Sequence, residues 1–445
     1  MKFNELRSKY PNFIYHDYKI EEIDDSLVVT YNMEIEGLST FNPCFKVAKN
    51  IITNQKINKD LLEYLIFNIG MAEAISYYKV SCPKNFIIKA GYLDVEALSW
   101  WRKLYYLGLG EFFYVNGIDV TEEDLVNFKC LKDKTNYSDS EFKSSGNIIC
   151  VGGGKDSIVS LETLKDMDNV CFTINAKEIH KECIKTAGYN SFINVTRILD
   201  QNMLSLNKQG YLNGHTPFSS IVAFYSYLIA YLTNRKYIVL SNESSANEPT
   251  ILNTKINHQY SKSIEFEKDF NNYAQKYFNL DIHYFSVLRP LKEIQIAYLF
   301  SKLEKYHHIF KSCNVGSKTL PWNWCGDCPK CLFVFIILSP FLDLSYLSDI
   351  FGKNLYEDQN LLDTFLELLG KKETKPFECV GTVEEVGYAV SKAIRKNSTS
   401  LPYLLKYYQD NFELIEDELL DEYNTDHLLP LEFENIIKRQ MNKND

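Results

Sequence analysis

The sequence predicts an α/β protein with a parallel sheet, an N-terminal α+β region and a helical C-terminal region. Three observations predict it: short apolar segments alternate with helical patterns mid-chain, a glycine-rich turn links one such pair, and strong strand patterns end before about residue 341. This alternation is typical of βαβ units, whose parallel sheets are covered on both faces. We expect three regions, over residues 1–140, 141–340 and 341–445.

The N-terminal region is rich in aromatic residues from Asn32 to about Cys130 and carries a helical pattern over Lys59–Tyr78. The polar stretch Lys132–Asn147 follows it. Because clusters of Ser, Asn, Asp and Gly between periodic segments are typical of loops, we expect this stretch to be the linker to the central region.

The central region begins with a predicted strand that leads into the glycine-rich turn. Its predicted strands are NIICVG (147–152), VCFTIN (170–175), SFINVTRI (191–198) and YIVLSN (237–242). The most apolar runs are Ser219–Leu232, which is too short to span a bilayer, and Cys331–Leu347, which Pro340 and Asp343 interrupt. We expect both runs to form buried helices.

The composition excludes several classes of protein. A net charge of −10 at pH 7 argues against a broad nucleic-acid surface, which needs clustered positive charge. The first 25 residues contain no apolar core of the signal-peptide type. Eleven cysteines in a chain of 445 residues do not make a disulfide scaffold. We therefore expect a cytoplasmic protein with neither a membrane nor a nucleic-acid partner.

The segment CVGGGKDSIVSLETLKD, Cys150–Asp166, is a candidate phosphate site. Glycines between a strand and a helix let backbone N–H groups approach an anion, and the helix N-terminus adds partial positive charge. Lys155 adds a cation, and Ser157 can cap the helix or contact a phosphate oxygen. A turn without a ligand is the alternative. The pattern is neither a Walker A loop, since Asp156 separates Lys155 from Ser157, nor a G-x-G-x-x-G fingerprint.

Four of the cysteines lie close together in the sequence: Cys313, Cys325, Cys328 and Cys331. Successive C-x-x-C spacings, with a glycine and a proline available for the turns, suit a tetrahedral Zn²⁺ site. Buried free thiols and an iron–sulfur cluster are the alternatives. No open coordination position is indicated, so we interpret the site as structural.

The glycine turn resembles the pyrophosphate loop of the PP-loop ATP pyrophosphatases, which has the pattern S/G-G-G-x-D-S after the first strand. Those enzymes cleave ATP between the α and β phosphates and transfer AMP to an oxygen of a second substrate. The resemblance implies a PP-loop fold of the adenine nucleotide alpha-hydrolase type and an ATP-binding domain over 141–340. Asp156 is expected to help hold Mg²⁺, because a carboxylate beside phosphates needs a cation. The residues expected to bind pyrophosphate are Gly152, Gly153, Gly154, Lys155, Asp156 and Ser157.

Further segments extend the resemblance from about residue 70 to residue 381. They are GMAEAISYYK (70–79), GLGEFFYVN (108–116), VGGGKDS (151–157), NGHTP (213–217), LSNESSANE (240–248), NHQYSKS (257–263), LRP (288–290), WCGDCPKC (324–331) and FECVG (377–381). In order and number they resemble the ATP-dependent UDP-N-acetylmuramoyl-L-alanyl-L-glutamate epimerases of peptidoglycan synthesis. Tyr78 departs from the pattern, where tryptophan is expected. Another PP-loop enzyme, such as a 7-cyano-7-deazaguanine synthase or a tRNA-modifying ligase, is the alternative.

The epimerase resemblance implies inversion of the α-carbon of the terminal L-glutamate, with ATP converted to AMP and pyrophosphate. Adenylation neutralises the carboxylate and acidifies the neighbouring C–H bond, so an ordinary side chain can act as base. Lys155, Mg²⁺ and the loop N–H groups are expected to stabilise the departing pyrophosphate. The UDP-muramoyl dipeptide and ATP are then the expected small-molecule partners.

Polar segments beside predicted strands and helices supply further candidate residues. Loops at the C-terminal ends of parallel strands bind ligands in open α/β sheets. We therefore expect Asn242, Glu243 and Ser244 to line the nucleotide site or carry Mg²⁺, with a solvated loop as the alternative. His215 precedes a helix start and is either a catalytic residue that faces the ligand or a structural histidine.

Recognition of a diphosphate and carboxylates needs basic residues. Lys262, Arg289 and His258 are the candidates, and surface salt bridging is the alternative. Inversion also needs an acid or base on each face of the α-carbon. Cys379, beside Glu378, is our candidate for one of them, and a buried packing cysteine is the alternative.

Overall fold

The computed structural model describes residues 3–133, 142–248, 260–313, 315–316, 323–398, 400–416 and 418–442. These residues form one mixed sheet of eleven strands in the order β11-β10-β7-β8-β9-β4-β2-β1-β5-β6, with β3 paired to β2. The strands are β1 (Asn12–Ile23), β2 (Ser26–Ile35), β3 (Ser39–Phe41), β4 (Cys44–Ala48), β5 (Asn85–Ile88), β6 (Asn127–Cys130), β7 (Asn147–Cys150), β8 (Asn169–Ile174), β9 (Phe192–Ile198), β10 (Tyr237–Leu240) and β11 (His283–Ser286).

Strands β7 to β11 form a parallel group in the spatial order β11-β10-β7-β8-β9. The chain moves outward from β7 to β9 and then returns to the other side of β7 to add β10 and β11. The point between β7 and β10 is therefore a topological switch point, where open α/β sheets bind their ligands. The parallel strands predicted for the central region are confirmed, and β11 is a strand that the sequence analysis missed.

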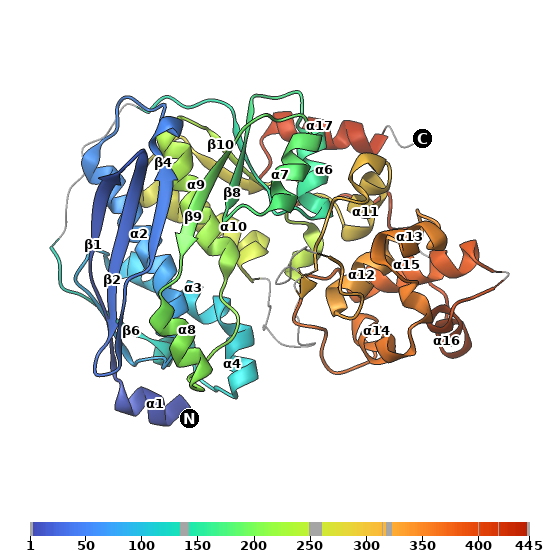
Figure 1. Cartoon of the computed structure of the whole chain (residues 1–445), viewed down its shortest axis with the longest axis horizontal. Coiled ribbons are helices and arrows are strands. Elements are labelled where there is room, and N and C mark those ends of the chain that lie inside the picture. Colours follow the sequence, from blue (N-terminus) through green and yellow to red (C-terminus); the bar gives the residue numbers. More distant parts are fainter. Residues whose placement is uncertain are drawn as a thin grey trace.

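Strands β1, β2 and β4 form an antiparallel group, and β4 joins it to the parallel group by pairing antiparallel with β9 (Figure 1). On the other side, β5 and β6 continue parallel beside β1. One sheet therefore runs through the predicted N-terminal and central regions. The predicted boundary at residue 140 falls within 134–141, outside the described residues, and stays a prediction.

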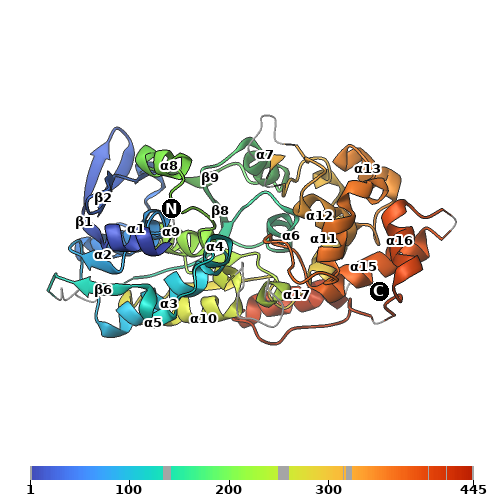
Figure 2. The same ribbon diagram turned by 90° about the horizontal axis from the view of Figure 1, so that it is seen from below.

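Helices cover the sheet and build the C-terminal region, and Figure 2 shows α12, α13, α15 and α16 at the opposite end of the molecule from β1 and β2. The predicted helix Lys59–Tyr78 is confirmed as α2, and the run Ser219–Leu232 lies in α9. The helices are α1 (Phe3–Lys9), α2 (Lys59–Tyr78), α3 (Val95–Gly108), α4 (Gly110–Asn116), α5 (Glu122–Leu125), α6 (Lys155–Thr163), α7 (Glu178–Thr186), α8 (Gln201–Lys208), α9 (Phe218–Leu232), α10 (Ile264–Tyr277), α11 (Glu293–Ser301), α12 (Pro329–Leu338), α13 (Leu344–Phe351), α14 (Leu362–Leu368), α15 (Val383–Lys396), α16 (Tyr403–Asn411) and α17 (Leu431–Asn442).

The apolar run Cys331–Leu347 divides into two helices instead of one. The first, α12, ends at Leu338, because Pro340 cannot continue a helix, and Asp343 is the N-cap residue of α13. Among the described residues, no helix combines the length and the apolar character that a membrane crossing requires.

Successive residues of the parallel strands enter two different hydrophobic cores. Ile148 and Ile238 belong to the core that contains α2, α9 and α10, whereas Ile149 and Val239 belong to the core that contains α6, α11, α12 and α15. Strand side chains alternate between faces, so the sheet is the middle layer between these two cores. Burial on both faces explains why the strands read as short apolar runs without polar alternation.

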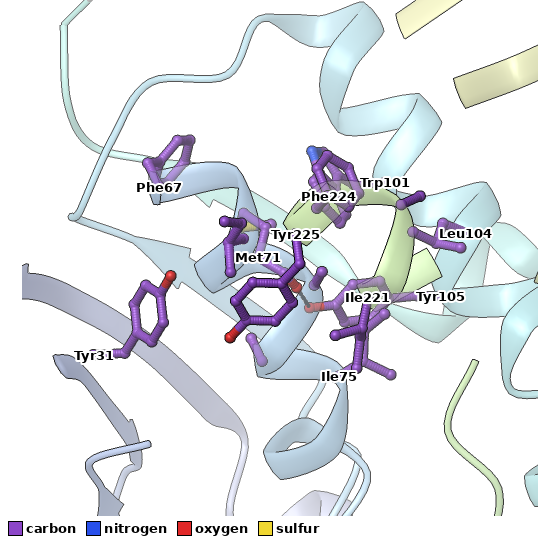
Figure 3. Close-up of a cluster of buried hydrophobic side chains, with 14 of the residues drawn as sticks. Tyr31, Phe67, Met71, Ile75, Trp101, Leu104, Tyr105, Ile221, Phe224 and Tyr225 are labelled. Carbon is purple, nitrogen blue, oxygen red and sulfur yellow. Dashed lines mark hydrogen bonds between the residues drawn. The ribbon is translucent and has the colours of Figure 1, made fainter. Parts of the chain in front are cut away.

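Large aromatic side chains from α2, α3 and α9 dominate the first of these cores (Figure 3). Trp101 stacks on Phe224, with 5.1 Å between the ring centroids. Gly70 lies within α2, and a Cβ at that position would lie 2.0 Å from the hydroxyl of Tyr15. The close approach of this ring explains a glycine inside a long helix, where it costs about 1 kcal/mol relative to alanine.

A buried ion pair joins α2 to the parallel group of strands. Arg197 of β9 donates two hydrogen bonds to the carboxylate of Glu73, at 2.6 and 2.7 Å, and Tyr225 of α9 donates a third at 3.0 Å. The side chain of Glu73 is only 2% exposed. A buried carboxylate is tolerated when it is paired and hydrogen-bonded, so this contact holds α2, β9 and α9 together.

We expect Arg197→Met to lower the free energy of unfolding by about 3–5 kcal/mol, because it leaves the Glu73 carboxylate buried without its cation. The double variant E73Q/R197M is expected to recover much of this loss, since no buried charge remains. Urea denaturation followed by tryptophan fluorescence measures both free energies. A double variant as unstable as R197M alone would contradict this account of the pair.

Candidate functional site

A cavity of about 420 Å³ opens at the carboxyl ends of β7, β8 and β10, beside the switch point. Its wall combines the loops after β7 and β10, the end of β8 and the start of α9 with Lys262, Lys311 and Lys330. The fold therefore brings together many of the residues proposed from separate sequence segments. Those in the cavity wall are Gly152, Gly154, Asp156, Ser157, Asn242, Glu243, Lys262 and Cys379.

Two other segments pack closely against the glycine loop after β7. Gly153 has a φ of +77°, a conformation that favours glycine. A Cβ on Gly153 would lie 3.0 Å from the ring of His180, and a Cβ on Gly154 would lie 2.8 Å from the hydroxyl of Ser312. Gly152, in contrast, has open space at this position and lines the cavity. The loop is supported from outside while its backbone borders the cavity, an arrangement that suits an anion.

His180, in the first turn of α7, is a cavity residue that the sequence analysis missed. Its Nδ1 accepts a hydrogen bond from the amide of Lys177 at 3.0 Å, which places the proton of the neutral ring on Nε2. Burial, reinforced by Lys177 and opposed by a hydrogen bond with the Gly152 backbone, lowers the pKa of His180 to about 4. The ring is therefore neutral at pH 7 and acts as a fixed support for the loop.

Three carboxylates, those of Asp156, Glu243 and Glu293, gather beside the loop, and one oxygen of each lies within 4.8 Å of the others. The buried ammonium of Lys155 contacts both Asp156 and Glu293. Burial alone would lower the pKa of Lys155, but attraction to these two carboxylates raises it, so the ammonium stays charged. Lys155 is thus an internal counterion in this structure, and its contact with pyrophosphate stays a prediction.

The carboxylates respond differently to this environment. Burial raises the pKa of Glu293 to about 8, opposed by Lys155 and reinforced by its acidic neighbours. Burial and repulsion from Asp156 raise the pKa of Glu243. For Asp156 burial is outweighed by Lys155 and Lys330, which lower its pKa. Three carboxylates with oxygens this close together offer the hard donors that fit Mg²⁺, so the predicted role of Asp156 gains two candidate partners.

Arg289 is fully buried behind the cavity wall. Its guanidinium donates to the carbonyls of Glu243, at 2.5 Å, and of Lys262, and also to the Glu267 carboxylate, at 2.5 Å. The first two bonds fix the backbone of Glu243 and of Lys262, both of which line the cavity. The predicted contact between Arg289 and the substrate stays a prediction, as does a substrate contact of Lys262.

Three polar candidates of the nucleotide and substrate sites remain, and each has a different outcome. Asn242 lines the cavity, and its amide donates to the hydroxyl of Ser286 at 2.9 Å. Ser244 is not among the residues of the cavity wall, and its hydroxyl donates to the carbonyl of Leu291 at 3.0 Å. His258 lies in 249–259, outside the described residues.

His215 lies in the loop before α9 and does not belong to the cavity wall. Its Nδ1 is 3.5 Å from the carboxylate of Glu111. The ammonium of Lys79 contacts the carbonyl of Gly214 and, at 2.7 Å, the hydroxyl of Thr216. Three of the segments that carried the epimerase resemblance therefore meet at this loop, while the catalytic role of His215 stays a prediction.

The four predicted metal ligands come together in the structure. The sulfurs of Cys313 and Cys328 are 3.9 Å apart, those of Cys325 and Cys331 3.7 Å, and those of Cys328 and Cys331 3.5 Å. Zinc–sulfur bonds of about 2.3 Å in a tetrahedron place the sulfurs roughly 3.8 Å apart. The cluster therefore fits a structural zinc ion with cysteine in every position.

Residues beside the cysteine cluster join it to the cavity. The amide of Lys311, two residues before Cys313, donates to the carbonyl of Gly153 at 3.2 Å. Lys330 lies between the last two cysteines, and its ammonium donates to the carbonyl of Cys379. Both lysines line the cavity. The cysteine cluster is therefore in a position to fix these two positive charges of the cavity, together with the loops that contain Gly153 and Cys379.

The fold and the cavity define an open α/β protein with a candidate ligand site at the carboxyl edge of its parallel strands. Two family models match nearly the whole chain. The MurL N-terminal domain matches residues 4–287 and the MurL C-terminal domain matches residues 309–420, so the chain belongs to the MurL family.

Curated relatives named UDP-N-acetyl-alpha-D-muramoyl-L-alanyl-L-glutamate epimerase align over most of the chain. The relative from Xanthomonas oryzae pv. oryzae is 34% identical over 326 residues, which are 71% of this chain and 71% of the relative. The relative from Micromonospora sp. is 35% identical over 333 residues, 73% of each chain. The relative from Salinispora tropica is 34% identical over 331 residues, 71% of this chain and 70% of the relative. No solved structure matches this chain significantly.

His180→Asn is expected to make the stability of the protein less sensitive to acid, because asparagine keeps an acceptor for the Lys177 amide but does not titrate. The native pKa of His180, about 4, lies below the ordinary value of 6.5. As the pH falls from 6.5 to 4, the unfolded wild type takes up a proton that the native state does not, which costs on the order of 1–3 kcal/mol. The free energies of unfolding of wild type and H180N, measured by urea denaturation between pH 6.5 and pH 4, test this prediction. A stability difference between wild type and H180N that is independent of pH would show the histidine to be unimportant.

The purified protein is expected to contain one zinc ion per chain, and Cys328→Ser is expected to lose it. Elemental analysis measures the metal, with Cys44→Ser of β4 as the matched control. Because Lys311 and Ser312 hold the glycine loop, metal loss is also expected to speed hydrogen exchange in the peptide that contains Gly152–Gly154. A metal-free wild-type protein, or exchange unchanged by metal loss, would count against this coupling.

Proposed function

We propose that this protein is an ATP-dependent epimerase that converts the terminal L-glutamate of UDP-N-acetyl-α-D-muramoyl-L-alanyl-L-glutamate to D-glutamate in peptidoglycan precursor synthesis. The names of the curated relatives support the substrate and the inversion. One observation carries the ATP-dependent chemistry: the glycine loop at the switch point borders a cavity that also contains carboxylates and three lysines. Such a site suits phosphates held by backbone amides and cations.

The cavity wall has an apolar part and a charged part, which we assign to the two ends of ATP. The apolar part includes Phe172, Ile174 and Leu240 and suits the adenine base. The charged part includes the glycine loop, Lys311 and Lys330 and suits the phosphates. The PP-loop interpretation of the glycine turn calls for this arrangement, with the phosphates at the turn.

Asp156, Glu243 and Glu293 are the residues that would hold Mg²⁺, which would neutralise charge on the phosphates when bound. The chain prepares these side chains in two ways. Lys155 pairs with two of the carboxylates, and Arg289 fixes the backbone carbonyl of the third. Preorganised charges of this kind need little rearrangement during the reaction, which is how electrostatic catalysis gains its effect.

Adenylation explains why an epimerase would use ATP. A free carboxylate resists loss of the neighbouring α-proton, because the product would be a dianion. Transfer of AMP to the carboxylate removes that charge, releases pyrophosphate into the glycine loop and acidifies the C–H bond. Cys379, in the same cavity, is then our proposed acid or base on one face of the α-carbon. After inversion, water releases AMP from the acyl-adenylate and leaves the D-product.

The proposal gives the protein two small-molecule partners, the UDP-muramoyl dipeptide and ATP. The net charge of −10 argues against an extended nucleic-acid surface. It is compatible with small anionic substrates that bind in a local basic cavity. We place the reaction in the cytoplasm, where ATP is available.

Incubation of the protein with ATP, Mg²⁺ and UDP-N-acetylmuramoyl-L-alanyl-L-glutamate tests the proposal. Chiral analysis of the glutamate after hydrolysis is expected to show the D-isomer, formed together with AMP and pyrophosphate. Glutamate that remains fully L, or turnover that gives ADP, would refute the proposed function.

Asp156→Asn is expected to lower the rate of AMP formation by at least about 100-fold, because it removes a charged Mg²⁺ ligand without changing the shape of the side chain. Asp166→Asn, an exposed position beyond the end of α6, is the matched control and is expected to keep the wild-type rate. Initial rates with saturating dipeptide measure both variants. A D156N rate within about threefold of the control would exclude Asp156 from the reaction.

A further inference from the structure

Lys262 and Cys379 contact each other in the cavity wall. The ammonium of Lys262 donates to the sulfur of Cys379 at 3.0 Å, and both residues line the cavity. Lys262 ends the short 3₁₀ helix Tyr260–Lys262, whereas Cys379 lies in the loop between α14 and α15. An ammonium against a thiol favours the thiolate, the form of cysteine that accepts protons and attacks electrophiles.

Contacts behind the pair fix both partners without using the thiol or the ammonium. The guanidinium of Arg289 donates to the backbone carbonyl of Lys262, and Lys330 donates to the backbone carbonyl of Cys379. Lys375 donates at 2.8 Å to the carbonyl two residues beyond Cys379. The distance between Nζ and Sγ is therefore set by the fold and does not require a ligand to close it.

Charges of both signs lie near the pair. Burial would lower the pKa of Lys262, but attraction to Cys379 and Glu243 raises it, so the ammonium keeps its proton. A second lysine, Lys330, holds the backbone of the cysteine. Lys262, Lys330 and Lys375 favour the thiolate, whereas Glu378, Glu243 and Asp156 disfavour it. The ammonium of Lys262 is hydrogen-bonded to the sulfur itself.

Two other cysteines of the α/β region show what the lysine contact changes. Burial raises the pKa of Cys171 to about 12, and burial with nearby Glu182 raises that of Cys183 to about 12 as well. The thiol of Cys183 contacts the carbonyl of Gly153 at 3.9 Å and not an ammonium. Burial is the main reason that both thiols stay protonated, whereas Cys379 is only half-buried and has an ammonium hydrogen-bonded to its sulfur.

We infer that Lys262 is a positioning residue that keeps Cys379 as a thiolate, and that this thiolate is the base that removes the α-proton. The inference depends on the proposed function for its substrate, and it gives Lys262 a different role from the substrate contact predicted from sequence. In the step, the Cα–H bond breaks, an S–H bond forms, and the electron pair enters the acyl carbonyl to form an enolate. A second donor protonates the opposite face, and exchange with water then removes the proton from the thiol and restores the proton of the donor.

Alkylation of Cys379 by iodoacetamide tests the inference without ATP or dipeptide, so its outcome is separable from that of the epimerase assay. The rate at Cys379 is measured by peptide mass spectrometry between about pH 6 and pH 9. Wild type is expected to react at a nearly constant rate over this range. Lys262→Met is expected to react about thirtyfold more slowly at pH 7, because a thiol with an ordinary pKa of about 8.5 is only about 3% ionised there.

Two further variants separate activation of the thiol from a loss of packing or of general positive charge. Lys262→Arg keeps the cation and is expected to restore most of the alkylation rate at pH 7. Lys311→Met removes a positive charge from the same cavity, and since the Lys311 ammonium donates to the His308 carbonyl, alkylation of Cys379 is expected to be unchanged. Equal rates in wild type and K262M would overturn the inference. If K262M does not fold, a wild-type rate that rises tenfold per pH unit up to pH 8.5 would overturn it instead.

Discussion

The close packing of the glycine loop between α7 and the segment before the cysteine cluster is the constraint on which the candidate site depends. His180 packs against Gly153 and Ser312 against Gly154, so closely that a Cβ at either glycine would force its neighbour to shift. The amide of Lys311 holds the carbonyl of Gly153 as well. The shape of the loop therefore depends on contacts between three segments far apart in the sequence. The cavity results from tertiary contacts around the loop as much as from its glycines.

Two networks of buried charge lie behind this loop, and each carries a desolvation cost that an apolar core would avoid. In one, Lys155 pairs with Asp156 and Glu293, and in the other Arg289 pairs with Glu267 and binds two backbone carbonyls of the cavity wall. Buried pairs of this kind add little to stability. Their benefit here is positional, since they hold carboxylates, a lysine and backbone groups at fixed places around the ligand site.

Features that depend on residues close together in the sequence could be predicted from it. The helix Lys59–Tyr78, the strands before and after the glycine turn, and the grouping of the four cysteines all agree with the structure. β11 was missed because polar His283 and Ser286 flank its two apolar residues, so it lacks the apolar run that marks the equally short β7 and β10. Glu293 and His180 could not be predicted, since only the folded chain brings them to the loop from α11 and α7. The pairing of β4 with β9, which makes one sheet of two predicted regions, is a long-range contact of the same kind.

In the proposed reaction, the main-chain amides of Gly152–Gly154 hold the outer phosphates of ATP. A crystal structure of the protein with AMP, pyrophosphate and Mg²⁺ tests this arrangement. We expect pyrophosphate within hydrogen-bonding distance of these amides, with Mg²⁺ against the carboxylate of Asp156. Pyrophosphate bound at another place on the protein, with the glycine loop untouched, would contradict it.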